Sequence, residues 1–221
     1  MTVDDALEQL QSMGDDARRA YNTRMGAPAN QFGVKLGDIR AMAKKIKTDH
    51  ELARSLWGTG NVEAQLLATL IVKPASLSAD ELESMTRATT CAQVADWLNA
   101  YVVAKHPARD TLREKWMQAT DRWAARAGWQ LTASRVDRDP GGLDLAALLD
   151  RIEREMPAAT PEVQWTMNNT LAAIGITHAT HRRRVVAIGE QIGLYRDWPV
   201  SKGCTPPYVP VWVEAMVKRK A

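Results

Sequence analysis

A single carboxylate, Asp96, stands out among the side chains that could do chemistry. It lies within residues 91–98, whose apolar spacing predicts a helix. On such a helix its neighbours within one turn are Ala92, Ala95 and Asn99. These residues are small, so they would leave a hollow in front of the carboxylate. An ion pair with a basic side chain, or a plain charge on a helix face, is the alternative interpretation.

The residue spacings typical of other common catalytic and metal sites are absent from the sequence. The sequence has no glycine-rich phosphate-binding loop, no Gly-x-Ser-x-Gly stretch, and no His and Cys residues at zinc spacing. His178 and His181 lie three residues apart and are expected at a solvated helix start. Cys204 follows Gly203 and lies two residues from Lys202, which leaves both an activated thiol and a structural thiol open. We therefore expect neither a metal ion nor a cofactor.

Positive charge is concentrated in two stretches. The chain carries 29 Lys and Arg against 26 Asp and Glu, a net charge of +3, which excludes a general polycation. Residues 24–54 hold seven basic and three acidic residues, and residues 176–221 hold eight and three. Such stretches on a helical stack can follow a DNA phosphate backbone, or they can be solvated helix faces. The candidate phosphate-binding residues within them are Arg40, Lys44, Arg182 and Arg183.

Short helices would position these residues. Apolar residues recur with helical spacing, and no alternating strand or hairpin turn interrupts the pattern. We expect helices over residues 34–46, 62–72, 78–87, 91–104, 107–118, 121–135, 143–156, 161–175 and 178–193. Because few residues join each helix to the next, the sequence predicts an all-α stack of helical hairpins, a solenoid, over residues 1–194.

The remaining residues, 195–221, differ from this pattern. Residues 195–210 contain four prolines and cannot be helical throughout, but their aromatic residues and valines argue against disorder. We expect an ordered loop packed on the end of the solenoid, followed by a short capping helix over residues 211–221. The chain has eight tryptophans and one phenylalanine. We expect Trp57, Trp116, Trp123 and Trp129 to separate packed helices. We expect Trp198 and Trp212 to pin the tail.

The sequence also bears on the cellular setting. The N-terminus is acidic and lacks the pattern of a signal peptide, and two cysteines are too few for a disulfide framework. The densest apolar run covers residues 66–72, whereas about 20 residues are needed to cross a bilayer. We expect a soluble, cytoplasmic monomer without membrane contact.

Several segments, taken in order, resemble the DNA alkylation repair family, the HEAT-like-repeat (AlkD-like) DNA glycosylases. They run from about residue 15 to 190 and are residues 21–25, 32–34, 39–40, 53–57, 94–96, 126–128, 163–164 and 174–175, with Glu63, Leu67, Ala68 and Leu171 between them. The resemblance implies a HEAT- or armadillo-like solenoid whose concave basic face holds duplex DNA. It also implies excision of cationic N3- or N7-alkylated purines without flipping of the base. By this resemblance Asp96 matches the catalytic aspartate and Arg126 a phosphate-contacting arginine.

The sequence departs from the family pattern at the sugar-binding cradle. The family has a tryptophan where this chain has Ala92, a second tryptophan at Asn169, and an arginine at Ala172. Trp165 lies one turn before Asn169 and either replaces part of the aromatic cradle or is a packing residue. The amides of Asn168 and Asn169 can donate to phosphate or sugar oxygens. The tail around residues 201–206 is unlike that of the characterised glycosylases and resembles that of uncharacterised members of the wider family.

Three functions follow from these observations. The first is a divergent glycosylase for alkylated purines, in which Asp96 stabilises positive charge on the sugar and positions a water molecule. The second is a non-catalytic binder of damaged or branched double-stranded DNA. The third is a protein–protein scaffold, a common use of HEAT-like repeats. Asp96, Arg126 and the basic stretches favour the two DNA functions, and retention of the aspartate favours the repair enzyme.

Overall fold

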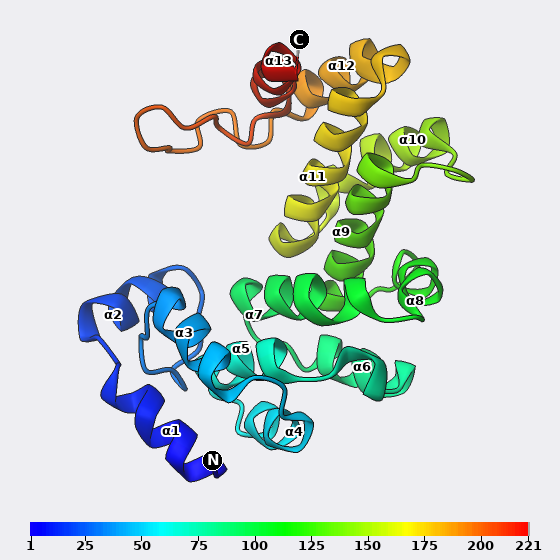
Figure 1. Cartoon of the computed structure of the whole chain (residues 1–221). Helices are drawn as coiled ribbons and strands as arrows, with labels where there is room; N and C mark the ends of the chain where they lie inside the picture. The colour runs from blue at the N-terminus through cyan, green and yellow to red at the C-terminus, as the bar shows by residue number, and fades with distance from the viewer. Residues whose placement is uncertain (221) are drawn as a thin grey trace. The chain divides into compact units, whose positions relative to one another are not determined.

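The protein is built from helices, as the sequence predicts. A computed structural model describes residues 1–220, and no β-strand occurs within that range (Figure 1). The chain forms two compact units, of which the first covers Met1–Leu112 and the second begins at Arg113. The boundary falls inside helix α8 (Arg109–Trp116), and the tail after residue 194 belongs to the second unit. Within residues 1–220, no helix is both long and apolar enough to cross a membrane.

The first unit contains seven α-helices before α8. They are α1 (Val3–Ser12), α2 (Asp16–Arg24), α3 (Leu36–Ile46), α4 (His50–Gly58), α5 (Val62–Ile71), α6 (Ala79–Arg87) and α7 (Ala92–Trp97). Short 3-10 turns lie at η1 (Pro74–Ser76) and η3 (Val103–Lys105), and a π-helical segment, η2 (Leu98–Val102), follows α7 directly.

Helix α5 forms the centre of this unit. It contacts α1, α3, α4, α7 and η2, and nine of its ten residues are buried. It begins directly after its N-cap Asn61, whose side chain accepts a hydrogen bond from the amide of Ala64 (3.1 Å). It ends before Pro74, which cannot continue a helix. The core of the unit is therefore organised around one short helix in the middle of its sequence.

The second unit is organised around two long helices. Helix α9 (Arg122–Arg138) packs along α11 (Pro161–Thr177), and α10 (Leu145–Glu155), α12 (Arg182–Ile192) and α13 (Val209–Lys220) surround α11. Gly128 is required on α9, because an added Cβ would lie 2.8 Å from backbone atoms of Trp116 and Met117. Two 3-10 turns, η4 (Met156–Ala158) and η5 (Ala179–His181), join successive helices.

The helices differ from the sequence predictions in several places. Helices α1 and α2 precede the first predicted helix, and α4 lies between the first and second predicted helices, where none is predicted. The single helix expected over residues 91–104 is divided into α7, η2 and η3, and the one expected to start at residue 178 starts at Arg182 after η5. Helix α13 begins at Val209 rather than residue 211, because Pro210 is tolerated in a first helical turn. Residue 221 is the last residue of the predicted helix over 211–221, and it lies outside the described residues.

Candidate nucleic-acid interface

Asp96 lies at a change of helix type in the first unit. It is the second-to-last residue of α7 and is half-buried, and the π-helical segment η2 begins two residues later. Short π-helical segments inside helices occur frequently at functional sites. Asn99, in η2, is buried, and within residues 1–220 no group hydrogen-bonds its side-chain oxygen Oδ1. The small residue Ala92 is exposed.

Two aromatic and two cationic side chains form a row along the segment that follows Asp96. The guanidinium of Arg40, on α3, lies 4.5 Å from the ring centre of Trp97 and 3.5 Å from the hydroxyl of Tyr101. The Trp97 and Tyr101 rings meet edge to face at 5.3 Å, and the ammonium of Lys105 lies 5.6 Å from the Tyr101 ring. We call these four residues the cation–aromatic row. The structure therefore brings the predicted residue Arg40 to the segment that follows Asp96.

The basic surface at this row includes one residue that the sequence analysis missed. Arg40, Lys105 and Lys44 are exposed, and Lys44 lies one turn after Arg40 on α3. Lys105 was not among the candidates. The four-residue spacing of Trp97, Tyr101 and Lys105 was the signal that could have found it, because residues four apart share a helix face.

Glu63 holds the backbone that leads into α3. It is buried on α5, and its carboxylate accepts hydrogen bonds from the amides of Phe32 (2.8 Å), Gly33 (2.8 Å) and Val34 (3.2 Å). Gly33 has φ +80°, and a Cβ there would lie 2.4 Å from the carbonyl oxygen of Asp15. Glu63 is thus a positioning residue for the segment that precedes Arg40 and Lys44.

Arg126 is buried in the second unit. It lies on α9 with 4% of its surface exposed, and its Nη1 donates a hydrogen bond to the carbonyl of Glu162 (2.8 Å). Burial raises the pKa of the Tyr195 hydroxyl, and the positive charge of Arg126 acts in the opposite direction. Arg126 and Tyr195 are therefore electrostatic neighbours, although they are far apart in sequence.

The polar residues predicted on α11 have different surroundings. Asn169 is half-buried and donates to the side-chain oxygen of Gln130 on α9 (3.0 Å). Asn168 is 1% exposed and donates to the carbonyl of Pro207 (2.9 Å), so it ties the tail to α11. Asn169 lies one turn after Trp165 on α11, and the amide of Asn168 is turned inward.

The two predicted arginines of α12 also differ. Arg182 donates to the carbonyls of Gly175 (2.8 Å) and Ile176 (3.4 Å), which are carbonyls of the last turn of α11. Such contacts with the carbonyl end of a helix are favourable for a cation. Arg183 is exposed at the start of α12. Arg182 thus has a structural partner already, whereas Arg183 faces solvent.

Trp165 belongs to a cluster of three aromatic rings. Its ring centre lies 5.4 Å from that of Tyr195 and 5.9 Å from that of Trp198, and Tyr195 and Trp198 are 5.3 Å apart. We call this cluster the aromatic triad. The contact of Trp198 with Trp165 fits the prediction that Trp198 anchors the tail. Tyr195 was missed, and no sequence pattern signalled its return to α11.

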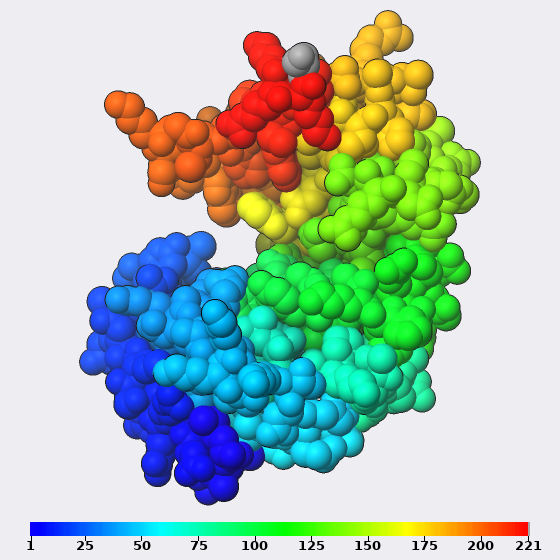
Figure 2. Space-filling model, in the orientation of Figure 1, coloured from blue at the N-terminus to red at the C-terminus, as the bar shows by residue number. Residues whose placement is uncertain are grey.

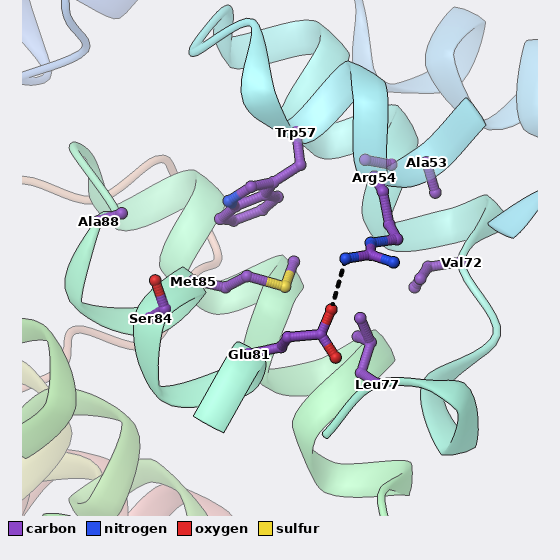
Figure 3. Close-up of a pocket in the computed structure, with 10 residues that line it drawn as sticks. Ala53, Arg54, Trp57, Val72, Leu77, Glu81, Ser84, Met85 and Ala88 are labelled. Carbon is purple, nitrogen blue, oxygen red and sulfur yellow. Dashed lines mark ion pairs between the residues drawn. The ribbon is translucent and has the colours of Figure 1, made fainter. Parts of the chain in front are cut away.

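A half-open pocket occurs elsewhere in the first unit. It has a volume of about 200 Å³, is bordered by α4, α5 and α6, and has mainly apolar walls that include Trp57, Leu77 and Met85 (Figure 3). Arg54 and Glu81 form an ion pair of 2.9 Å across it. None of the ten residues that line it is a predicted site residue. Within residues 1–220, no group of three or more His, Cys, Asp or Glu is arranged to hold a metal ion.

Comparison with known proteins agrees with this architecture. An uncharacterized protein of Listeria innocua, Lin0241, is 22% identical over 199 residues, which cover 87% of each chain, and Lmo0209 of Listeria monocytogenes is 21% identical over the same shares. A solved structure matches with a TM-score of 0.82 and 20% identity over 100% of this chain and 95% of its own. It is described as one of a new family of proteins related to the HEAT-like repeat DNA glycosylases with affinity for branched DNA structures.

The fold expected from the sequence is confirmed, because this structural match and the helices above are those of an all-α, HEAT-like repeat protein. The family model for DNA alkylation repair enzymes matches residues 6–191, most of the chain. The chain therefore belongs to the DNA alkylation repair enzyme family.

Proposed function

We propose that this protein binds double-stranded and branched DNA through its backbone phosphates and does not depend on base excision for its role. The observation that carries the proposal is the pair of residues at the family's tryptophan positions. Ala92 is exposed and has no aromatic surface, and the amide of Asn169 is hydrogen-bonded to Gln130. The aromatic cradle for a damaged nucleotide is thus replaced, whereas cationic side chains that suit phosphate remain.

Three further observations support a DNA ligand. In the first unit, Arg40 and Lys105 of the cation–aromatic row are exposed, as is Lys44 one turn after Arg40, and Arg183 is exposed in the second unit. Cationic side chains of this kind provide the part of DNA affinity that does not depend on base sequence. The structural relative with a TM-score of 0.82 is described as having affinity for branched DNA.

Fluorescence anisotropy with a labelled four-way junction and a linear duplex of equal length tests the proposal. We expect binding to both, with the logarithm of the binding constant falling linearly as the logarithm of salt concentration rises between about 50 and 200 mM. The double variant Arg40→Ala/Lys44→Ala should weaken binding to both DNAs and reduce the salt slope by roughly 2, one for each lost cation. Lys73→Ala is the matched control, because Lys73 is exposed at η1, outside the proposed interface.

Two results would contradict the proposal. Undetectable binding, or binding that salt does not weaken, would favour the protein–protein scaffold instead. Equal effects per removed charge for the Lys73→Ala control and the double variant would show that only net charge matters and not the cation–aromatic row.

A second candidate function, excision of alkylated purines, is favoured by the position of Asp96 beside η2. A carboxylate there has the charge needed to stabilise a developing sugar cation. The assay is release of methylated purines from alkylated duplex DNA by the native protein and by Asp96→Asn. Release that the variant abolishes would establish the enzyme, and release no greater than background would exclude it.

A further inference from the structure

The aromatic triad lies at the base of an exposed loop in the second unit. The loop covers residues 194–208 and projects from the helices that flank it, between α12 and α13 (Figures 1 and 2). Trp198 is 43% exposed and is the most exposed of the eight tryptophans, all of which lie within the described residues. One side of its ring contacts Trp165 and Tyr195, and the exposed remainder is accessible to a ligand.

The base of the loop is firmly held, so that Trp198 has a defined place. The guanidinium of Arg196 donates to the carbonyl of Glu190 (3.2 Å) and lies 5.5 Å from the ring centre of Tyr208. Asn168 holds the other end through the carbonyl of Pro207. Tyr195 has φ +63°, a conformation that is unfavourable for a residue with a Cβ. The surrounding contacts maintain it, and it directs the Tyr195 ring against Trp165.

Positively charged side chains lie on the loop and beside it. Arg126 is close enough to Tyr195 to influence its hydroxyl, and Lys202 is exposed near the tip of the loop. Arg219, on α13, approaches the hydroxyl of Thr205 at 3.5 Å, which places a third cation beside the loop. Asp197 is the one acidic residue of the loop. A ligand that combines a flat apolar face with negative charge fits this combination.

We propose that the aromatic triad is a stacking site for an unpaired nucleobase of DNA, with Trp198 as the residue that contacts the base and Lys202 beside the flanking phosphate. The inference rests on the proposed DNA-binding function and adds the part of the DNA that is recognised. Aromatic side chains stack on bases of any sequence, because every base has a flat π face. Bases inside an intact duplex are already stacked, so this site selects DNA in which bases are unpaired, as at a branch point, a gap or an end.

The test uses the full-length protein and two three-way junctions that differ only in two unpaired thymines at the branch point. Anisotropy gives their affinities. A third junction with 2-aminopurine at the unpaired position gives a direct signal, because its fluorescence falls when the base stacks. We expect the native protein to prefer the junction with unpaired bases by about tenfold and to quench 2-aminopurine.

Three variants distinguish stacking from other effects. Trp198→Ala should abolish both the preference and the quenching, and Trp198→Phe should keep most of each. Val200→Ala is the matched control, since Val200 is another apolar residue of the same loop and is 43% exposed, and it should leave both unchanged. Circular dichroism should give the same helix content for all three variants, because both positions are solvent-exposed.

The outcomes separate this inference from the proposed function. If the native protein binds duplex and junction in a salt-dependent manner but Trp198→Ala keeps the native preference and quenching, the stacking site is wrong and DNA binding stands. The same conclusion holds if the native protein has no preference for unpaired bases. If the native protein binds no DNA at any salt concentration, both are wrong, and the exposed Trp198 belongs to a protein interface.

Discussion

Replacement of Glu63 by glutamine is a strict test of how the first unit positions its basic residues. Oxygen Oε1 of Glu63 accepts the amides of Gly33 and Val34, and Oε2 accepts the amide of Phe32. Glutamine has one oxygen, so its amide nitrogen would face at least one backbone N–H donor. The variant preserves the volume of the side chain, which separates the hydrogen bonds from packing.

The magnitude follows from this geometry. One buried amide without an acceptor costs about 1–3 kcal/mol, and the remaining bonds lose their charge, which makes them weaker by roughly half. We therefore expect Glu63→Gln to lower the free energy of unfolding by about 2–4 kcal/mol. Glu63→Ala removes the acceptor for all three amides and should cost more, about 4–5 kcal/mol.

Urea denaturation and hydrogen exchange measure the effect. The amides of residues 32–34 should lose protection from exchange in Glu63→Gln before those of α9 and α11 change. Glu8→Gln is the control, because Glu8 is exposed on α1, and its effect should stay within about 0.5 kcal/mol. A Glu63→Gln variant as stable as the control, with residues 32–34 still protected, would refute the assignment of Glu63 as the positioning residue.

Three further predictions concern stability. Gly128→Ala places a Cβ 2.8 Å from the backbone at the end of α8 and should destabilise by about 1–3 kcal/mol in thermal unfolding. The backbone and hydroxyl of Ser78 lower the pKa of Glu81 below its ordinary 4.5, so the contribution of Glu81 to stability is complete above that value and disappears as the pH falls through the lowered pKa. The stability difference between native protein and Glu81→Gln, measured by urea denaturation, should therefore be present at neutral pH and disappear as the pH is lowered well below 4.5. Asn168→Ala removes the hydrogen bond to Pro207, which should cost about 1–2 kcal/mol and increase protease cleavage within residues 194–208.

For each of these three predictions, one experimental outcome would contradict it. Gly37→Ala is the control for Gly128→Ala, because a Cβ at Gly37 meets nothing within 4 Å, and equal effects of the two would show that the close approach is not limiting. A Glu81→Gln difference that grows as the pH falls would have the wrong sign. Unchanged proteolysis of Asn168→Ala would mean that other contacts suffice to hold the tail.

Local patterns in the sequence were sufficient to predict the helical class and most helices. Apolar periodicity and capping residues act within a few residues of each other, so the start of α5 at Asn61 and of α6 at Ser78 could be read directly. The choice of Asp96 as a candidate and the absence of aromatic residues at Ala92 and Asn169 also came from the sequence, through its resemblance to the family.

Tertiary structure decided what several of these side chains contact. Asn168 and Asn169 are adjacent in sequence, but one is hydrogen-bonded to the tail and the other to α9. Arg182 and Arg183 are equally basic, but only Arg182 contacts the carbonyl end of α11. The difference arises because adjacent positions on a helix point about 100° apart, so which one meets a neighbouring element depends on packing far away in the chain. The return of Tyr195 to Trp165 has the same origin, since a left-handed residue stabilised by distant contacts leaves no local pattern.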